Sequence, residues 1–188
     1  MEKKFISAQE LLDISTELAL QIYESGYRPN FIVGVWRGGA PIGICVQEIL
    51  DFLGIKTDHI AIRTSSYHAI GEQHTVRVHG LGYIEKKVNA EDKLLIIDDV
   101  YDTGRSIEQV IKELNLSCRK NAPEIKIATT YFKPLHNKTK RKPDFYVYET
   151  DRWLVFPHEL KGLTQQEIEQ HRPEIASIKN KISEAHIE

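Results

Sequence analysis

The stretch LLIIDDVYDTGRSIEQVI, residues 94–111, joins an aliphatic run, an acidic cluster and the start of a helical pattern. The run LLII is typical of a strand buried on both faces of a parallel sheet. Asp98 and Asp99 end this run, and Asp102 follows three residues on. In an open parallel sheet, ligands bind beyond the carboxyl ends of the strands. Three mutually repelling carboxylates at that position predict a ligand that is cationic or rich in hydroxyl groups.

The DTGRS turn after the acidic pair adds hydrogen-bond donors for an anion. Gly104 lets the backbone approach a ligand closely, while Thr103 and Ser106 supply hydroxyls beside the first amides of a helix. Helix starts of this kind commonly bind phosphate. The loop therefore combines phosphate donors with carboxylates that can accept from ribose hydroxyls, which predicts a sugar phosphate. Mg²⁺, which prefers oxygen ligands and phosphates, fits the same loop.

A second turn of the same type occurs in VGVWRGGAPIG, residues 33–43. A short apolar strand is followed by Arg37, Gly38 and Gly39, and then by a helix start. Alone this is a weak signal, because RGG after a strand can be a simple tight turn. Two phosphate-type loops on two strands of one sheet indicate a diphosphorylated sugar.

The order of elements predicts an α/β fold in a chain of 188 residues, enough for one domain with its own core. Strands and helices alternate, so we expect a mainly parallel central sheet flanked by helices. A helix is expected at 7–26, with Ser7 and Glu10 as a capping box. Residues 66–80 are polar and fit a long loop or a loose hairpin. Expected strands span residues 30–36, 58–64, 92–99, 124–132 and 144–149; further helices span 40–54 and 106–116.

Charge and cysteine content narrow the class of protein. Lys plus Arg number 25 against 27 Asp plus Glu, so no overall charge favours nucleic acid or a membrane surface. We see neither a signal-peptide core nor an apolar run of membrane-spanning length. Cys45 and Cys118 have no CxxC spacing, which fits the reducing cytoplasm.

At these residues the chain resembles the type I phosphoribosyltransferases, whose phosphoribosyl-pyrophosphate (PRPP) signature is matched by LLIIDDVYDTGRS. It is similar in particular to the 6-oxopurine branch. WRGG resembles that branch's pyrophosphate loop, SSY (65–67) the start of its mobile loop, and YFKP (131–134) the strand carrying its purine-reading lysine. KPDFYVYETDRWLVFPHE (142–159) resembles its hood. The resemblance implies the type I fold with a small hood over residues 1–160, a mobile loop at about 66–80, and a C-terminal helical extension over 161–188.

The resemblance implies a purine salvage enzyme that transfers 5-phosphoribosyl from PRPP to hypoxanthine, guanine or xanthine, with Mg²⁺. Ribose and 5-phosphate would be held by Asp98, Asp99, Thr103, Gly104, Arg105 and Ser106. Pyrophosphate would be held by Arg37 and Gly38, and the metal by Asp98, Asp99 and Glu159, where the family usually has aspartate. Ser66 and Tyr67 would begin a lid that excludes water. The family is usually dimeric or tetrameric, so we also expect a homo-oligomer.

Four residues would complete the reaction site by the same resemblance. Asp102 would be the general base near the purine N7; otherwise it caps the next helix. Lys133 would donate to the purine O6; otherwise it is a solvated lysine. Trp153 would stack on the purine, with the Leu154 carbonyl accepting from the ring edge; otherwise the aromatic ring packs in the core.

One alternative of another class stays open, a PRPP-fold regulator that senses a nucleotide and binds RNA or DNA without catalysis. The basic residues 138–142 keep this alternative open. The balanced overall charge and the set Asp102, Lys133 and Trp153 favour the enzyme.

Overall fold

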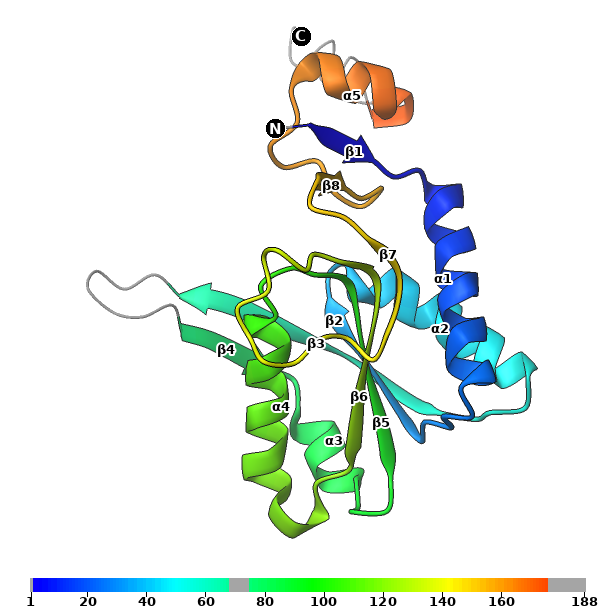
Figure 1. Cartoon of the computed structure of the whole chain (residues 1–188), viewed down its shortest axis with the longest axis vertical. Coiled ribbons are helices and arrows are strands. Elements are labelled where there is room, and N and C mark those ends of the chain that lie inside the picture. The colour runs from blue at the N-terminus through cyan, green and yellow to red at the C-terminus, as the bar shows by residue number, and fades with distance from the viewer. Residues whose placement is uncertain (1, 68–74, 176–188) are drawn as a thin grey trace, which may run out of the picture.

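A six-stranded sheet forms the centre of the protein in the computed structural model, which describes residues 2–67 and 75–175 (Figure 1). Its strand order is β4-β3-β2-β5-β6-β7, and only the β3–β4 pair is antiparallel. This is the mainly parallel α/β sheet that the sequence predicts. The strands are β2 (Phe31–Trp36), β3 (Asp58–Tyr67), β4 (Thr75–His79), β5 (Lys93–Tyr101), β6 (Glu124–Phe132) and β7 (Phe145–Glu149).

Helices cover both faces of the sheet, which explains the unbroken aliphatic runs. Leu95 and Ile97 of β5 belong to the core beneath α1 (Ala8–Glu24) and α2 (Gly39–Phe52). Leu94 and Ile96 belong to the opposite core, with α3 (Gly82–Lys87) and α4 (Arg105–Cys118). Successive strand residues point to opposite faces, so each face receives every second side chain. A 3₁₀ turn, η1 (Arg119–Asn121), leads from α4 into β6.

Helix α1 confirms the helix predicted at the start of the chain. Its N-cap is Ser7, whose hydroxyl accepts from the Glu10 backbone N–H at 3.0 Å. The Glu10 carboxylate instead lies 3.1 Å from Lys4 Nζ in an ion pair. After the helix ends at Glu24, Gly26 takes a positive φ of 78° that favours glycine. The buried residues recur at helical spacing and are Leu11, Ile14, Ser15, Leu18, Ala19 and Ile22.

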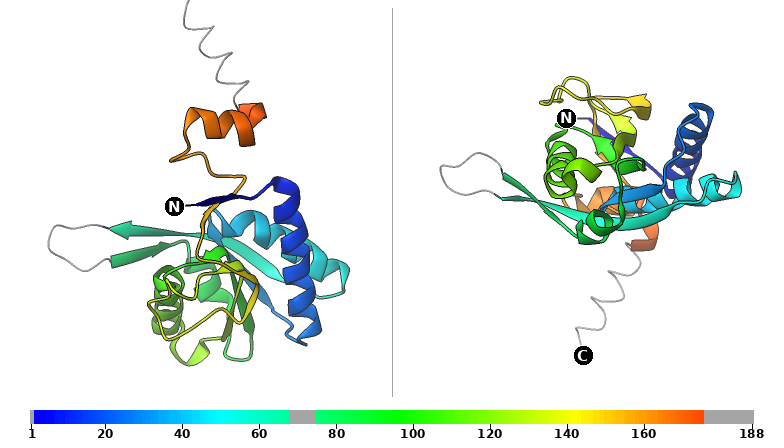
Figure 2. Two further views of the ribbon diagram at one scale, coloured as in Figure 1. Left: turned by 45° about the horizontal axis from the view of Figure 1, so that its top comes forward. Right: turned by 90° about the horizontal axis from the view of Figure 1, so that it is seen from below.

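The polar region expected at 66–80 contains a hairpin, one of the two alternatives that the sequence left open. Strand β3 runs through Ser66 and Tyr67, which pair with Val76 and Thr75 of β4. The hairpin stands out from the rest of the sheet (Figures 1 and 2). Residues 66, 67 and 75–79 are in the paired strands of this hairpin, and residues 68–74 lie outside the described residues.

A second, two-stranded sheet lies beyond the ends of the central strands, and we call it the hood sheet. It pairs β1 (Lys3–Phe5) in parallel with β8 (Trp153–Val155), which joins the first described residues to the predicted hood segment. Helix α5 (Gln165–His171) lies next to β1 (Figure 1). The Phe5 and His171 rings stack at a centroid distance of 3.7 Å. The predicted Thr164–Glu167 capping box is present at its start. Residues 176–188 of the predicted extension lie outside the described residues.

Among residues 2–67 and 75–175, no helix combines the length and apolar character needed to cross a membrane.

Candidate active site

The crevice of the sheet opens between β2 and β5. From β2 the chain crosses through α2 to β3, and from β5 it crosses through α4 to β6, on opposite faces. Strands β2 and β5 pair only as far as Gly34 and Ile97, whereas β5 stays paired with β6 to Tyr101. A reversal of strand order of this kind is where open α/β sheets bind ligands. Both predicted phosphate-type loops meet here.

The RGG turn can lie against the end of β5 because Gly38 and Gly39 have no side chains. A Cβ added to Gly38 would overlap the Asp99 carboxylate, and one added to Gly39 would overlap the Ile97 carbonyl oxygen. The Trp36–Arg37 peptide just before them is cis. The RGG turn therefore lies directly against the acidic end of β5. This juxtaposition brings the predicted pyrophosphate residues Arg37 and Gly38 into the same crevice as the predicted ribose residues.

Backbone N–H groups hold the carboxylates of Asp98 and Asp99 in place. Asp98 Oδ1 accepts from the Asp99 N–H at 3.0 Å, and Asp99 Oδ1 accepts from the Val100 N–H at 2.7 Å. Burial, followed by the charge of Asp99, raises the pKa of Asp98 well above its usual value. His158 Nε2 approaches Asp99 Oδ2 at 3.4 Å from the hood segment. Hydroxyl donors or a cation would relieve the repulsion between the two carboxylates.

The third predicted metal ligand does not join this pair. Glu159 Oε2 accepts from the Phe156 N–H at 3.2 Å, closing its own turn. Over the described ranges, no group of three or more His, Cys, Asp or Glu side chains is arranged to hold a metal ion. Mg²⁺ is commonly held by one or two carboxylates together with substrate phosphates, and Asp98 and Asp99 meet that requirement. The residues fit a metal that is carried in with a phosphorylated ligand.

A small cup of about 80 Å³ lies at the start of α4. Gly104 shapes it, because this residue has φ +77° and a Cβ there would lie 2.6 Å from the Tyr101 ring. Gly104 is also the N-cap of α4, so its neighbours present helix-start amides to the cup. Arg105 is exposed on the first turn. The lining residues are Asp98, Val100, Tyr101, Asp102, Thr103, Gly104, Ser106 and Ile107.

Asp102 lines the cup and is not the helix cap. Its two carboxylate oxygens have different partners. Oδ1 is 2.8 Å from His136 Nδ1, and Oδ2 is 3.7 Å from Lys133 Nζ. Since Gly104 takes the N-cap position, the capping alternative for Asp102 is wrong.

Lys133 is not the solvated lysine, and Trp153 is not the core aromatic ring, that the sequence left as alternatives. Lys133 follows the end of β6 and only 7% of its side chain is exposed, so it is not a solvated lysine. Its Nζ lies 6.0 Å from the centre of the Trp153 ring, and that ring is 55% exposed rather than packed in a core. Ammonium and indole thus face one space next to Asp102.

The pairing of β8 with β1 fixes the direction of the Leu154 backbone groups. The Trp153 N–H donates to Glu2 and the Val155 carbonyl accepts from Ile6, so these groups face β1. Peptide groups of neighbouring residues in a strand point to opposite sides. The Leu154 carbonyl therefore points away from β1.

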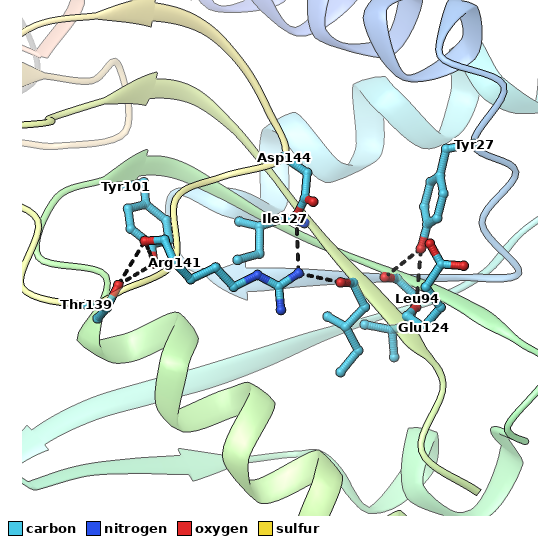
Figure 3. Close-up of polar contacts among 9 residues, drawn as sticks. Tyr27, Leu94, Tyr101, Glu124, Ile127, Thr139, Arg141 and Asp144 are labelled. Carbon is cyan, nitrogen blue, oxygen red and sulfur yellow. Dashed lines mark hydrogen bonds and ion pairs between the residues drawn. The ribbon is translucent and has the colours of Figure 1, made fainter.

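Sequence reasoning missed the connection that holds this side of the site, the loop of residues 133–144. The Tyr101 hydroxyl bonds to Thr139 Oγ1 at 3.0 Å and donates to the Arg141 carbonyl at 3.2 Å (Figure 3). The Arg141 guanidinium donates to the Ile125 carbonyl and pairs with Asp144. The basic run of residues 138–142 is therefore tied to the sheet through Arg141. Tyr101 lies within the PRPP-type signature, but nothing in its spacing predicts its partners.

Comparison with known proteins identifies the family. The family described as phosphoribosyl transferase domain matches residues 4–162. A hypoxanthine-guanine phosphoribosyltransferase of Lactococcus lactis is 27% identical over 147 residues, which are 77% of this chain and 75% of that protein.

Solved structures agree with this match. A purine phosphoribosyltransferase from Pyrococcus horikoshii is 30% identical, with a TM-score of 0.67 over 87% of this chain and 98% of that one. The xanthine-guanine-hypoxanthine phosphoribosyltransferase of Helicobacter pylori, at 21% identity, shares the fold, with a TM-score of 0.69 over 90% of this chain and 100% of that one. The chain therefore belongs to the phosphoribosyl transferase domain family.

Proposed function

We propose that the protein is a purine phosphoribosyltransferase that transfers the 5-phosphoribosyl group of PRPP to a 6-oxopurine, which is hypoxanthine, guanine or xanthine. The products are the nucleoside monophosphate and pyrophosphate. The observation that carries this proposal is the meeting of two phosphate-type loops with Asp102, Lys133 and Trp153 at one crevice. The Lactococcus and Pyrococcus relatives support it, since their names assign purine or hypoxanthine-guanine transfer to those proteins.

PRPP would bind across the gap between β2 and β5. Its 5-phosphate would enter the cup at the start of α4, where Thr103, Gly104, Arg105 and Ser106 offer amides and hydroxyls. The pyrophosphate would lie on Arg37 and Gly38. Asp98 and Asp99 would accept from the ribose hydroxyls and hold Mg²⁺, which supplies positive charge to the departing pyrophosphate. Glu159 remains a proposed contact of a second metal, reached only if its bond to the Phe156 N–H breaks.

The purine would occupy the space bounded by Lys133, Trp153 and Asp102. A buried ammonium ion suits the exocyclic O6, because the 6-amino group of adenine offers a donor there instead of an acceptor. The exposed Trp153 ring would stack on the purine face. The outward Leu154 carbonyl would accept from the ring edge. These contacts favour 6-oxopurines over adenine.

Transfer then requires one bond to form and one to break at the anomeric carbon. The purine nitrogen bonds to C1′ while the C1′–O bond to pyrophosphate breaks, and the electron pair leaves with pyrophosphate. The proton on N7 passes to Asp102, which acts as general base. Positive charge develops on the ribose ring, and the carboxylates of Asp98 and Asp99 would stabilise it. The lid proposed to begin at Ser66 and Tyr67 would exclude water, since hydrolysis of PRPP competes with transfer.

Two further parts of the proposal concern the setting of the enzyme. We propose that it acts in the reducing cytoplasm, which the unpaired Cys45 and Cys118 support. We also propose that it forms a homo-oligomer, for which apolar side chains exposed near α2 give the main support.

The function is tested by following nucleotide formation in the ultraviolet, with PRPP, Mg²⁺ and each of hypoxanthine, guanine, xanthine, adenine, uracil and orotate. We expect turnover with at least one 6-oxopurine, none with adenine or the pyrimidines, and loss of activity when a chelator removes Mg²⁺. Binding of PRPP or a nucleotide without turnover of any base would instead favour the regulator.

The role of Asp102 is tested with Asp102→Asn, which keeps the side-chain shape and removes the base. General bases typically contribute between about 10² and 10⁴ in rate, so we expect kcat to fall within that range while PRPP affinity changes little. Unchanged kcat would remove Asp102 as the base.

A further inference from the structure

His136 is the one direct side-chain hydrogen-bond partner of Asp102 in the described part of the chain. Its Nδ1 lies 2.8 Å from Asp102 Oδ1, a good hydrogen-bond distance, whereas the Lys133 ammonium lies 3.7 Å from Oδ2. A carboxylate has only these two oxygens. The histidine occupies one of them and leaves the other, Oδ2, on the side of the Lys133 ammonium.

The position of His136 is set by the backbone of its loop. The His136 N–H donates to the Lys133 carbonyl at 3.2 Å, and the Lys138 N–H donates to the Thr103 carbonyl at 3.0 Å. The second of these bonds joins the loop to the turn that carries Asp102. Beyond it, the Tyr101–Thr139–Arg141 contacts hold the loop to β5 (Figure 3). The backbone at His136 is thus held beside Asp102 by contacts that do not depend on the carboxylate.

The pair of His136 and Asp102 is too exposed to contribute much to the stability of the fold. Both side chains are about two-fifths exposed, at 41% for His136 and 43% for Asp102. Pairs as exposed as this contribute little to the free energy of unfolding. A hydrogen bond that fixes the rotation of a reacting carboxylate has a different use, because a base must hold its oxygen within hydrogen-bond reach of the proton that it takes.

We propose that His136 is a positioning residue for Asp102. Its Nδ1–H donates to Oδ1 and turns the carboxylate so that Oδ2 points toward the purine space. Oδ2 then receives the N7 proton, and His136 itself neither gives up nor takes a proton. This inference rests on the proposed function, because it presupposes that Asp102 is the base.

Three variants test this role. His136→Ala removes the donor, and the loss of a hydrogen bond to a charged group predicts a fall in kcat of roughly tenfold or more. KM for PRPP should stay within about twofold, since PRPP binds through other residues. His136→Asn keeps an N–H near the position of Nδ1, so it should recover most of kcat. Leu135→Ala, which trims a neighbouring side chain that is 77% exposed, is the matched control and should behave like the wild type.

Coupling to Asp102 separates positioning from a general effect on the loop. In the Asp102→Asn background, His136→Ala should lower kcat no further, because the carboxylate that it orients is gone. An undiminished tenfold loss in that background would overturn the proposal, as would equal activity of His136→Ala and the wild type. Equally low kcat values for His136→Asn and His136→Ala would also overturn it.

A measurement without turnover completes the test. Long-range ¹H–¹⁵N correlation spectra of the imidazole should place a proton on Nδ1 of His136, and this signal should shift in Asp102→Asn. A ring protonated only on Nε2 could not donate from Nδ1 to Asp102 Oδ1, which would overturn the proposal. A wild-type protein that turns over no 6-oxopurine would overturn the proposed function itself, whereas failure of the His136 variants alone leaves that function in place.

Discussion

Gly38 lies so close to Asp99 that any side chain at this position must displace the carboxylate. We expect Gly38→Ala to leave the fold intact and to weaken PRPP use, with kcat/KM for PRPP lower by about 100-fold, as an error of about 1 Å in an active site can cause. Steady-state kinetics with varied PRPP would measure this. The reason is local: the added methyl group pushes apart the two loops that form the crevice.

The matched control for Gly38→Ala is Gly43→Ala. Gly38 is the N-cap of α2, and Gly43 lies within that helix. A Cβ at Gly43 would lie 3.8 Å from the Gly34 Cα, an ordinary contact. We expect near wild-type kinetics there, together with a small gain in helix propensity. Equal losses in both variants would attribute the effect to α2 as a whole instead of to the Gly38–Asp99 contact.

An ion pair joins helix α5 to strand β1, and its response to pH can be predicted. Lys3 Nζ lies 2.7 Å from Glu167 Oε1, and the Lys3 and Thr164 donors lower the pKa of Glu167 from 4.5 to about 2. Because the folded pKa is depressed, the stabilisation is complete above about pH 4.5 and is lost as pH falls toward 2. We therefore expect α5 to loosen from the hood sheet across that window.

Hydrogen-exchange protection in α5, followed between pH 6 and pH 2 on the native protein, would measure this. The Ile168 and Arg172 amides are suitable reporters, since they donate to Thr164 and Ile168 within the helix. Glu167→Gln removes the ionising group and should flatten the response over that window. A decline as steep in Glu167→Gln as in the wild type would assign the effect to other carboxylates.

A helix or strand can be predicted from the sequence when its own residues carry an apolar periodicity. Strands β2, β3, β5, β6 and β7 and helices α1, α2 and α4 have an apolar pattern of their own, and they were predicted within a few residues. Strand β4 was expected only as part of the hairpin alternative for residues 66–80. The short elements β1, β8 and α3 were missed. Strand β1 spans three residues and exists because it pairs with β8, about 150 positions along the chain. A contact so distant leaves no periodic signal in either segment.

The same distinction applies to the site. Asp98 to Ser106 form one local motif with a helix start, so the sequence alone indicates a phosphate cup. His136 follows β6, and its partner Asp102 follows β5, so only the packing of the two strands brings them together. The glycine fit against Asp99 likewise depends on β2 lying beside β5.

The molecule as a whole leaves an apolar surface beside its crevice. Trp36 and Ile44 are large and exposed, and they line one cavity of about 180 Å³ between α2, β2 and β3. Clustered exposed apolar side chains are typical of interaction sites. Helix α2 begins at Gly39, the last residue of the RGG turn, so a second copy seated here would also support the proposed pyrophosphate loop. This is the surface that we assign to the proposed homo-oligomer.

Ile44→Lys tests that assignment, because Ile44 is 64% exposed and a charge there should not disturb the monomer's own core. We expect the wild type to be larger than one 21.6 kDa chain by light scattering after size exclusion, and the variant to shift toward the monomer. Burying an unpaired ammonium in an apolar interface costs several kcal/mol. Because each 1.4 kcal/mol weakens association about tenfold, this cost should dissociate the oligomer at micromolar protein concentration. Leu116→Lys, an exposed apolar position on α4, is the control and should keep the wild-type mass. An oligomer that survives Ile44→Lys unchanged would place the interface elsewhere on the molecule.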